Sequence, residues 1–363
     1  EKLLGRVRKL LLLRRERLCC KGDFLKFQAS LALQCFTNEY VYGETDEETI
    51  AIERLEKSID RAYYNKEELT PYDIATLASY RPLNIYSWSR DIEIPSALGS
   101  VFKRQVFEVD RENDICRDIA RLNPIKDSVS LDVQTQYEEN PYPRWRFTLR
   151  PIKGNYLKKI SDKTGDCLSN ENFYKAPQIL IAGCGTGEQV VGWSAYKNAK
   201  ITAIDLSNKS LAYSIRKSKE LKLKNVNYYH LDLLDLDLLN KKFDVIVSTG
   251  CLHHMEKPED GLRSLVNVLK PDGLLYLGLY SRRARSEINW TRNYIQRKKI
   301  ETTDKNMRAF REKMLKSSTE EFNFLKKSLD FFCLSNFRDL IFNYNEHSFD
   351  LIQIKKLLEN NKL

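Results

Sequence analysis

The sequence lacks the cysteine spacings that build metal sites. Its eight cysteines include no C-x-x-C pair, and none of them lies at a zinc-finger spacing. The sequence also shows no secretory signal, which argues against the oxidising compartments where disulfides persist. We therefore expect reduced thiols, several of them packed in the core, no metal site, and a cytoplasmic protein.

Long apolar runs are missing as well. The run Leu10–Leu13 has four leucines, far fewer than the roughly 20 apolar residues of a transmembrane helix. Basic residues surround it, namely Arg6, Arg8, Lys9, Arg14, Arg15 and Arg17. We expect no membrane span, and a basic helix packed on an upstream module. Because the first residue is Glu1 rather than methionine, we also expect the chain to be part of a longer protein.

The charge is unbalanced, with 60 basic and 50 acidic residues and a formal net charge of +10. Such an excess leaves nucleic acid open as a partner. The basic residues are mostly lysines mixed with acids, which is also typical of solvated helices, and no segment has the pattern of a known RNA-binding module. With 363 residues and 42% hydrophobic content, the chain is long and apolar enough for two domains, or for one large domain with an added module.

Residues 1–122 are predicted to be helical. Between 47 and 61, Ile52, Leu55 and Ile59 recur among alternating charges, as in an amphipathic helix. Thr70 followed by Pro71 predicts an N-cap and the first turn of another helix. No convincing internal repeat period is present.

Residues 123–176 change character, because four prolines at 124, 141, 143 and 151 prevent a continuous helix. Within them, residues 136–145 read Q-Y-E-E-N-P-Y-P-R-W, and we call this the aromatic segment. Two interpretations stay open for the range 123–176. It is a linker whose aromatic side chains hold it on a domain surface, or it is a cap over the mouth of a cofactor site.

From residue 177 onward, strand and helix patterns alternate. Apolar runs predict strands at 179–182, 201–204, 226–230, 245–248 and 274–279, with helices near 188–197, 209–221 and 259–269. This alternation predicts an α/β fold, a Rossmann-like, mostly parallel sheet with helices on both faces, preceded by the all-α region. We expect this domain to cover 177–363.

The glycine-rich stretch after the first strand predicts a nucleoside-containing cofactor. Gly183, Gly185 and Gly187 permit a sharp turn and close approach of a ligand. Asp205 follows Gly183 by 22 residues, at the end of the second strand, where an acid meets ribose hydroxyls. Glu188 stands where a dinucleotide motif has its last glycine, and its charge opposes a pyrophosphate. S-adenosylmethionine carries no phosphate and fits better.

The end of the third strand supports the same cofactor. Asp232 is placed to accept from the adenine amino group, and Leu233 to pack on the ring. Further predicted cofactor contacts are Cys184, Thr186, Leu206, Gly250 and Arg144.

Four motifs in order resemble class I S-adenosylmethionine-dependent methyltransferases: I-A-G-C-G-T-G-E at 181–188, A-I-D-L-S at 203–207, L-H-H-M at 252–255 and L-K-P-D-G-L at 269–274. The resemblance implies cofactor contacts at Gly183, Gly185, Gly187, Asp205 and Asp232. The aromatic segment, 34–41, 278–281 and the stretch from Arg338 to His347 are similar to a bacterial subgroup in which such a domain often follows tetratricopeptide repeats.

Two departures from the family pattern affect the expected site. Many members carry an acid two positions before the first glycine, where this chain has Ile181, so Arg144 or Glu188 is the candidate for that polar contact. The family sheet also has two strands that would follow Leu363, which predicts a five-stranded sheet here and a helix near 349–360.

The leading hypothesis is methyl transfer from S-adenosylmethionine to an unidentified acceptor, with a protein or peptide favoured over a small molecule and nucleic acid left open. Transfer is largely a positioning task, aided by a group that removes or orients a proton. The catalytic candidates are Asn140, Tyr142, His253, Tyr280, Glu346 and His347, with Glu139 a further one. Two interpretations stay open for the loop after the fourth strand. His253 and His254 are bases or hydrogen-bonded structural histidines, and Cys251 is a nucleophile or a packed thiol. A cofactor-binding regulatory or scaffolding module and an oxidoreductase are the competing hypotheses.

Overall fold

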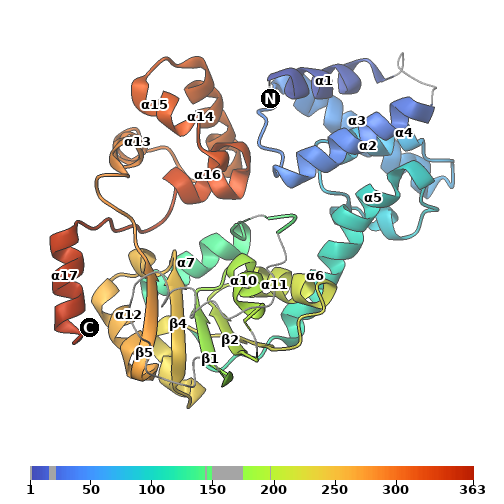
Figure 1. The fold of residues 1–363 in the computed structure, drawn as a ribbon. Helices are drawn as coiled ribbons and strands as arrows, with labels where there is room; N and C mark the ends of the chain where they lie inside the picture. Colours follow the sequence, from blue (N-terminus) through green and yellow to red (C-terminus); the bar gives the residue numbers. More distant parts are fainter. Residues whose placement is uncertain (1, 16–21, 144, 149–174, 197) are drawn as a thin grey trace. The chain divides into compact units, whose positions relative to one another are not determined.

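The computed structural model describes residues 2–15, 22–143, 145–148, 175–196 and 198–363 (Figure 1). The chain forms two compact units, one of Glu1–Arg111 with Asn293–Leu340 and one of Glu112–Arg292 with Ile341–Leu363. The ranges predicted from the sequence, 1–122, 123–176 and 177–363, divide the chain differently and stay a prediction. The difference arises because 293–340 packs with the N-terminal helices.

The first unit is helical. Its main helices are α1 (Lys2–Leu13), α2 (Gly22–Thr37), α3 (Asp46–Tyr64), α4 (Pro71–Ala78), α5 (Gly99–Phe102), α14 (Asp304–Lys316), α15 (Glu320–Leu325) and α16 (Leu334–Ile341). Thr70 is the N-cap of α4 and accepts a hydrogen bond from the backbone N–H of Asp73, and Pro71 opens the helix, as predicted. The apolar stripe of Ile52, Leu55 and Ile59 is buried in the core.

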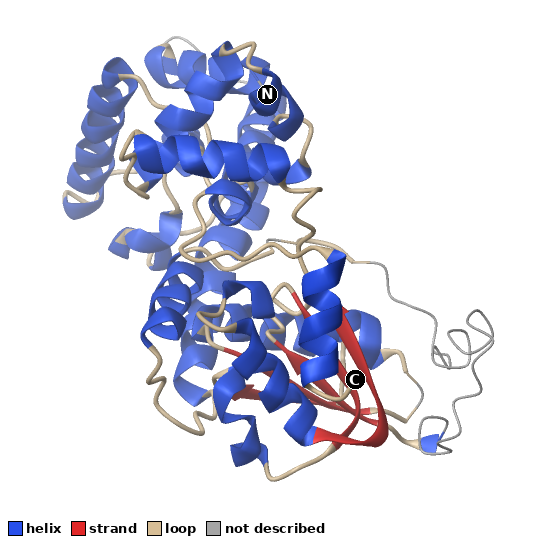
Figure 2. Cartoon of the chain, turned by 90° about the vertical axis from the view of Figure 1, so that its left-hand side faces the viewer, coloured by secondary structure: helices blue, strands red, loops and turns tan. Residues whose placement is uncertain are grey.

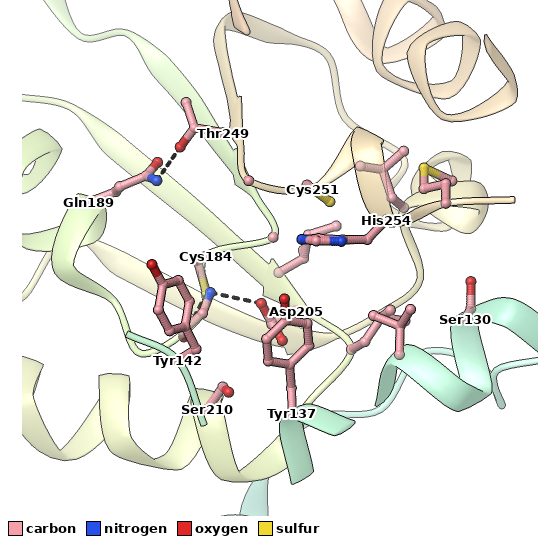
Figure 3. A pocket seen from close by; sticks show the side chains of 18 of the residues that line it. Ser130, Tyr137, Tyr142, Cys184, Gln189, Asp205, Ser210, Thr249, Cys251 and His254 are labelled. Atoms are coloured by element: carbon pink, nitrogen blue, oxygen red, sulfur yellow. Dashed lines mark hydrogen bonds between the residues drawn. The ribbon is translucent and has the colours of Figure 1, made fainter. Parts of the chain in front are cut away.

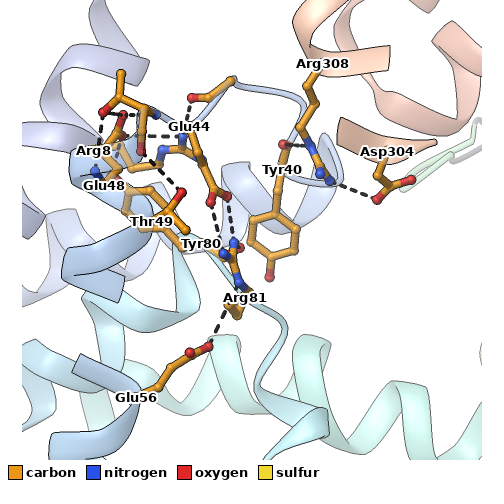
Figure 4. A network of polar contacts seen from close by, with 12 residues as sticks. Arg8, Tyr40, Glu44, Glu48, Thr49, Glu56, Tyr80, Arg81, Asp304 and Arg308 are labelled. Atoms are coloured by element: carbon orange, nitrogen blue, oxygen red, sulfur yellow. Dashed lines mark hydrogen bonds and ion pairs between the residues drawn. The ribbon is translucent and has the colours of Figure 1, made fainter. Parts of the chain in front are cut away.

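A buried polar network holds α1, α3 and α4 together (Figure 4). The guanidinium of Arg8 lies 4.0 Å from the centre of the Tyr80 ring, and the Tyr80 hydroxyl donates to Glu48 over 2.7 Å. Beside it, Arg81 donates two hydrogen bonds to the carboxylate of Glu44. The basic cluster predicted around Leu10–Leu13 therefore has a structural use at Arg8.

Polar contacts over long sequence separations join 293–340 to the N-terminal helices. Arg308 of α14 donates to the carbonyl of Tyr40 over 2.8 Å (Figure 4). The carboxylate of Glu39 accepts from the backbone N–H of Ser335 over 2.6 Å and from the thiol of Cys333. These contacts explain why the C-terminal helices belong to the helical unit.

The second unit contains a five-stranded parallel sheet in the order β3-β2-β1-β4-β5 (Figures 1 and 2). Its strands are β1 (Gln178–Ala182), β2 (Lys200–Asp205), β3 (Val226–His230), β4 (Phe243–Thr249) and β5 (Leu269–Gly278), with crossover helices α10 (Glu188–Ser194), α11 (Asn208–Glu220) and α12 (Pro258–Val268). The predicted α/β class and the alternation of strands and helices are confirmed.

Helices cover both faces of the sheet because successive strand residues point to opposite sides. Ile179 and Ile181 of β1 belong to an apolar cluster with Leu211 of α11. Leu180 belongs to a second cluster with Leu262 of α12. The apolar runs of the sequence are continuous because both faces are buried, which is typical of parallel strands.

The start of β5 differs from the sequence prediction, which began this strand at residue 274. Leu269 already pairs with Phe243, and pairing resumes with Leu274 opposite Val245. Four residues of β5 lie between these two pairs, against one residue of β4, so β5 bulges here. Asp272, within this bulge, has a φ of 59°. The strand therefore begins at Leu269 and contains an irregularity before Leu274.

Four further helices of the described chain lie wholly or partly in this unit. They are α6 (Glu108–Asp118), α7 (Ser128–Glu139), α13 (Ser286–Arg297) and α17 (Leu351–Asn360). Helix α7 lies between the prolines of 123–150, with Asp127 as its N-cap, and was not predicted. Helix α17 matches the expected helix near 349–360. In the described part of the chain, no helix is both long and apolar enough to cross a membrane.

Candidate functional site

The glycine loop begins where β1 ends. Gly185 and Gly187 have φ values of 51° and 88°, in the left-handed region that favours glycine. Space is also restricted, because a Cβ on Gly185 would lie 2.6 Å from the carbonyl oxygen of Tyr142. A Cβ on Gly187 would overlap the hydroxyl of Ser214 in α11. The spacing of these glycines follows from backbone conformation and from what packs on the loop.

Gly187→Ala is expected to destabilise the second unit by at least about 1–2 kcal/mol. Alanine is strained in the left-handed conformation of this residue, and its Cβ would also overlap Ser214. Gly192→Ala is the matched control within the same loop and helix. Nothing would lie within 4 Å of its Cβ, and it is expected to stabilise α10 by about 0.5–1 kcal/mol. Urea unfolding of both variants measures the difference, and equal stabilities would contradict this account of the loop.

Asp205 lies at the end of β2 and faces the glycine loop. Its carboxylate accepts from the backbone N–H of Gly185 over 2.7 Å and from that of Ser207 over 2.8 Å. The side chain is almost fully buried, and burial raises the pKa of Asp205 to about 6, against the lowering effect of these two hydrogen bonds. The carboxylate is therefore fixed in place and remains ionised at neutral pH.

Asp232 occupies the corresponding position after β3. Its carboxylate accepts from the backbone N–H of Leu234 over 3.0 Å, which caps the following helical turn. Burial raises the pKa of Asp232 from its ordinary value. Leu233 follows it, buried at the edge of the same cavity. Two acids thus stand at the carboxyl ends of neighbouring parallel strands.

The aromatic segment packs on the glycine loop. The carbonyl of Tyr142 accepts from the backbone N–H of Thr186 over 3.3 Å. The indole of Trp145 donates to the carbonyl of Thr186 over 3.1 Å, and the ring lies edge-on to Tyr213 of α11. This geometry fits the cap interpretation of the segment.

Helix α7 completes this side of the site. Gln134 donates to the carbonyl of Leu206 over 3.0 Å, and the hydroxyl of Ser207 donates to the carbonyl of Tyr137 over the same distance. The carboxylate of Glu138 accepts from the backbone N–H of Asn208, at the first turn of α11. These bonds hold α7 against the loop that follows β2.

The loop, the strand ends and α7 enclose a cavity of about 310 Å³ (Figure 3). Predicted cofactor-binding residues that line it are Gly183, Cys184, Gly185, Asp205, Leu206, Asp232, Leu233 and Gly250. Of the catalytic candidates, Tyr142 and Tyr280 line it, and Glu188, the candidate for a polar cofactor contact, lines it as well. Thr186, Gly187, Asn140, His253, Glu346 and His347 do not line it. Arg144 lies outside the described residues.

His253 is fully buried, and its ring stacks on Tyr280 with 3.8 Å between centroids. Neither ring nitrogen has a hydrogen-bond partner among the described residues, and burial lowers the pKa of His253 to about 2. The imidazole is thus neutral and serves as packing behind the wall formed by Tyr280.

His254 does line the cavity. Its Nδ1 lies 2.8 Å from the carbonyl oxygen of Asn345. Burial lowers the pKa of His254 to about 4, so this ring is also neutral at pH 7. The sequence could not separate the two neighbouring histidines, because which of them faces the cavity depends on the short helical turn Leu252–His254.

Three of the catalytic candidates have structural contacts instead. Glu346 is buried and accepts two hydrogen bonds from the guanidinium of Arg285, over 2.7 and 2.6 Å. His347 lies with its Nε2 3.0 Å from the carbonyl oxygen of Met255. Asn140 ends α7, and its backbone N–H donates to the carbonyl of Gln136.

Other lining residues were not predicted, among them Ser130, Val133, Tyr137, Pro143, Gln189, Ser210, Thr249 and Met255. Ser130, Val133 and Tyr137 share one face of α7 at helical spacing, but Ser130 is polar, so the sequence shows only a weak apolar periodicity there. Among the residues that the structure describes, no three His, Cys, Asp or Glu side chains gather as a metal site requires.

Comparisons with known proteins agree with this geometry. Residues 180–277 match the model of a family described as "Methyltransferase domain". An uncharacterised protein of Synechococcus is 33% identical over 45% of this chain and 40% of its own length. The malonyl-[acyl-carrier protein] O-methyltransferase of Acetivibrio thermocellus is 29% identical over 39% of this chain and 48% of its own. The match supports the predicted methyltransferase domain over residues 180–277.

Among solved structures, PKMT2 from Rickettsia typhi in complex with AdoHcy is 20% identical, with a TM-score of 0.48, over 61% of this chain and 44% of its own. The chain therefore spans less than half the length of each of these three proteins.

Proposed function

We propose that this chain transfers a methyl group from S-adenosylmethionine to an acceptor. The observation that carries the proposal is the position of Asp205, fixed by the glycine loop inside a cavity that Asp232 also lines, within a methyltransferase domain. S-adenosylmethionine supplies an electrophilic methyl group, so the task of the protein is to hold it in line with a nucleophile.

The residues of the cavity fit this cofactor. Asp205 accepts hydrogen bonds from ribose hydroxyls, and Asp232 accepts from the adenine amino group, with Leu206 and Leu233 beside the ring. Gly183 lines the same cavity, and in this proposal its backbone lies beside the methionine part of the cofactor. A sulfonium and an ammonium are compatible with these carboxylates, whereas a pyrophosphate would be repelled.

The acceptor is a protein or a peptide in this proposal. Support comes from the helical unit that accompanies the methyltransferase domain and from the resemblance of the aromatic segment to a bacterial subgroup associated with tetratricopeptide repeats. A small molecule and a nucleic acid are the other possible outcomes of the test.

Tritium-labelled methyl transfer into a bacterial lysate tests the function. We expect label in the protein fraction after separation into protein, RNA and small molecules, and none when an excess of S-adenosylhomocysteine competes for the site. The control is the chain with Asp205→Ala. Tight S-adenosylmethionine binding without label in any fraction would overturn the proposal in favour of a regulatory or scaffolding module. Binding of a nicotinamide cofactor instead would indicate an oxidoreductase.

A further inference from the structure

We infer that the acceptor atom carries a hydrogen, as an amine or hydroxyl does, and that Nε2 of His254 positions it by accepting that hydrogen in a hydrogen bond. The inference rests on the proposed function and deepens it, because it excludes carboxylates as acceptors. It follows from the tautomer of one histidine, from the position of its ring, and from the charges of the cavity.

The tautomer of His254 is fixed by its neighbour. Nδ1 lies 2.8 Å from the carbonyl oxygen of Asn345, and a carbonyl oxygen only accepts hydrogen bonds, so Nδ1 carries the proton. The side-chain amide of Asn345 in turn donates to the carbonyls of His254 and Met255, over 3.1 and 2.8 Å. These two hydrogen bonds hold Asn345, and with it the Asn345 carbonyl, in place. A neutral imidazole has one N–H, and therefore Nε2 presents a lone pair.

The ring is placed to use that lone pair. It lies almost fully buried in the wall of the cavity, edge-on to Tyr137 and Tyr280, with centroid distances of 6.2 and 6.3 Å. Figure 3 shows the imidazole extending from the loop after β4 into the pocket that also holds Asp205. Nε2 has no hydrogen-bond partner among the described residues. A bound methyl acceptor with an N–H or O–H group would donate a hydrogen bond to it.

The charge of the described lining argues against an anionic acceptor. Three lining residues are acids, Glu188, Asp205 and Asp232, and the described lining contains no lysine or arginine. Arg285 lies behind the wall with its guanidinium 3.7 Å from the centre of the Tyr280 ring, but its charge is matched by Glu346. A carboxylate would enter this space unpaired and would face a lone pair on His254, which is unfavourable on both counts.

The reaction then balances in one step. The lone pair of the neutral amine or hydroxyl forms a bond to the methyl carbon, and the carbon–sulfur bond breaks with its electrons left on sulfur. S-adenosylhomocysteine is the second product. The nucleophile gives up one proton to solvent, while Nε2 of His254 accepts the hydrogen bond that orients the attacking atom.

Alkaline treatment of the labelled product tests the acceptor class. Methyl esters of carboxylates hydrolyse in mild alkali and release volatile labelled methanol, whereas N-methyl amines and methyl ethers keep the label. We expect the label to be retained. Release as methanol would overturn the inference and leave the proposed function intact. Bound S-adenosylmethionine with no label in any fraction would overturn both.

His254→Gln and His254→Leu test the role of Nε2. The glutamine amide oxygen reaches the position of Nε2, and leucine fills the space without an acceptor. We expect kcat to fall about 100-fold for leucine and markedly less for glutamine, with little change in the Kd for S-adenosylmethionine. Should the leucine variant fail to fold, His254→Asn replaces it, because its shorter amide does not reach Nε2. Equal loss of kcat in glutamine and acceptor-free variants would overturn the assignment.

Discussion

Asp205→Ala is expected to weaken S-adenosylmethionine binding by about 100-fold or more. The carboxylate would accept hydrogen bonds from ribose hydroxyls in a buried site, and a hydrogen bond to a charged group contributes about 1.5–3 kcal/mol. Two such bonds correspond to at least two factors of ten in Kd, at about 1.4 kcal/mol for each. Isothermal titration calorimetry on the folded variant measures the change.

Asp205 also accepts from the backbone N–H groups of Gly185 and Ser207, so the alanine variant disturbs the loop as well. Asp205→Asn separates the two roles, since it keeps one side-chain oxygen as an acceptor and loses the charge. Asp237→Ala, an exposed acid outside the cavity, is the control and should bind normally. An unchanged Kd in Asp205→Ala would remove the ribose assignment.

The pH dependence of binding follows from the same residue. Burial raises the pKa of Asp205 from 3.8 to about 6, so the folded protein without cofactor binds this proton more tightly than the unfolded chain does. This group therefore contributes stability below pH 3.8 that is lost as the pH rises through 6. Cofactor binding needs the ionised form and changes in the opposite direction. At pH 5 about one-tenth of Asp205 is ionised, and Kd should be about tenfold higher than at pH 7.

The sequence contained most of the information for the cofactor half of the site. The strands before Gly183, Asp205 and Asp232 are apolar runs with both faces buried, and the carboxyl ends of parallel strands meet at one edge. The position of each polar residue was therefore determined by local pattern together with sheet geometry. The same reasoning could not place α7, because its many serine, threonine and glutamine residues show little amphipathic pattern and its stability comes from packing on α11.

The acceptor half depends on contacts between distant parts of the chain. Nothing near Glu346 in the sequence indicates that Arg285 neutralises it, and nothing near His254 indicates that the Asn345 carbonyl selects its tautomer. The helical unit poses the same problem, since the contact of Glu39 with Ser335 spans 296 positions. A glutamate followed by a histidine, as at 346 and 347, resembles a catalytic pair until burial and partners are known.

Glu346→Ala is accordingly expected to lower the stability of the folded protein. Its side chain is 1% exposed and pairs with Arg285, which is 10% exposed, while Arg292 lies 3.9 Å away. Removing the carboxylate leaves a buried guanidinium without its counterion, and breaking a buried ion pair in this way costs about 3–5 kcal/mol. Urea unfolding should show a loss of this size.

Glu359→Ala is the matched control, because Glu359 pairs with Lys355 in the same unit with both side chains exposed, and such a pair contributes less than about 1 kcal/mol. The double variant Arg285→Met with Glu346→Leu should recover much of the lost stability, since it removes both charges together. Tyr280 would lose the guanidinium over its ring in that variant, so transfer is expected to fall even where stability returns. Normal stability of Glu346→Ala with lost transfer would instead restore Glu346 as a catalytic residue.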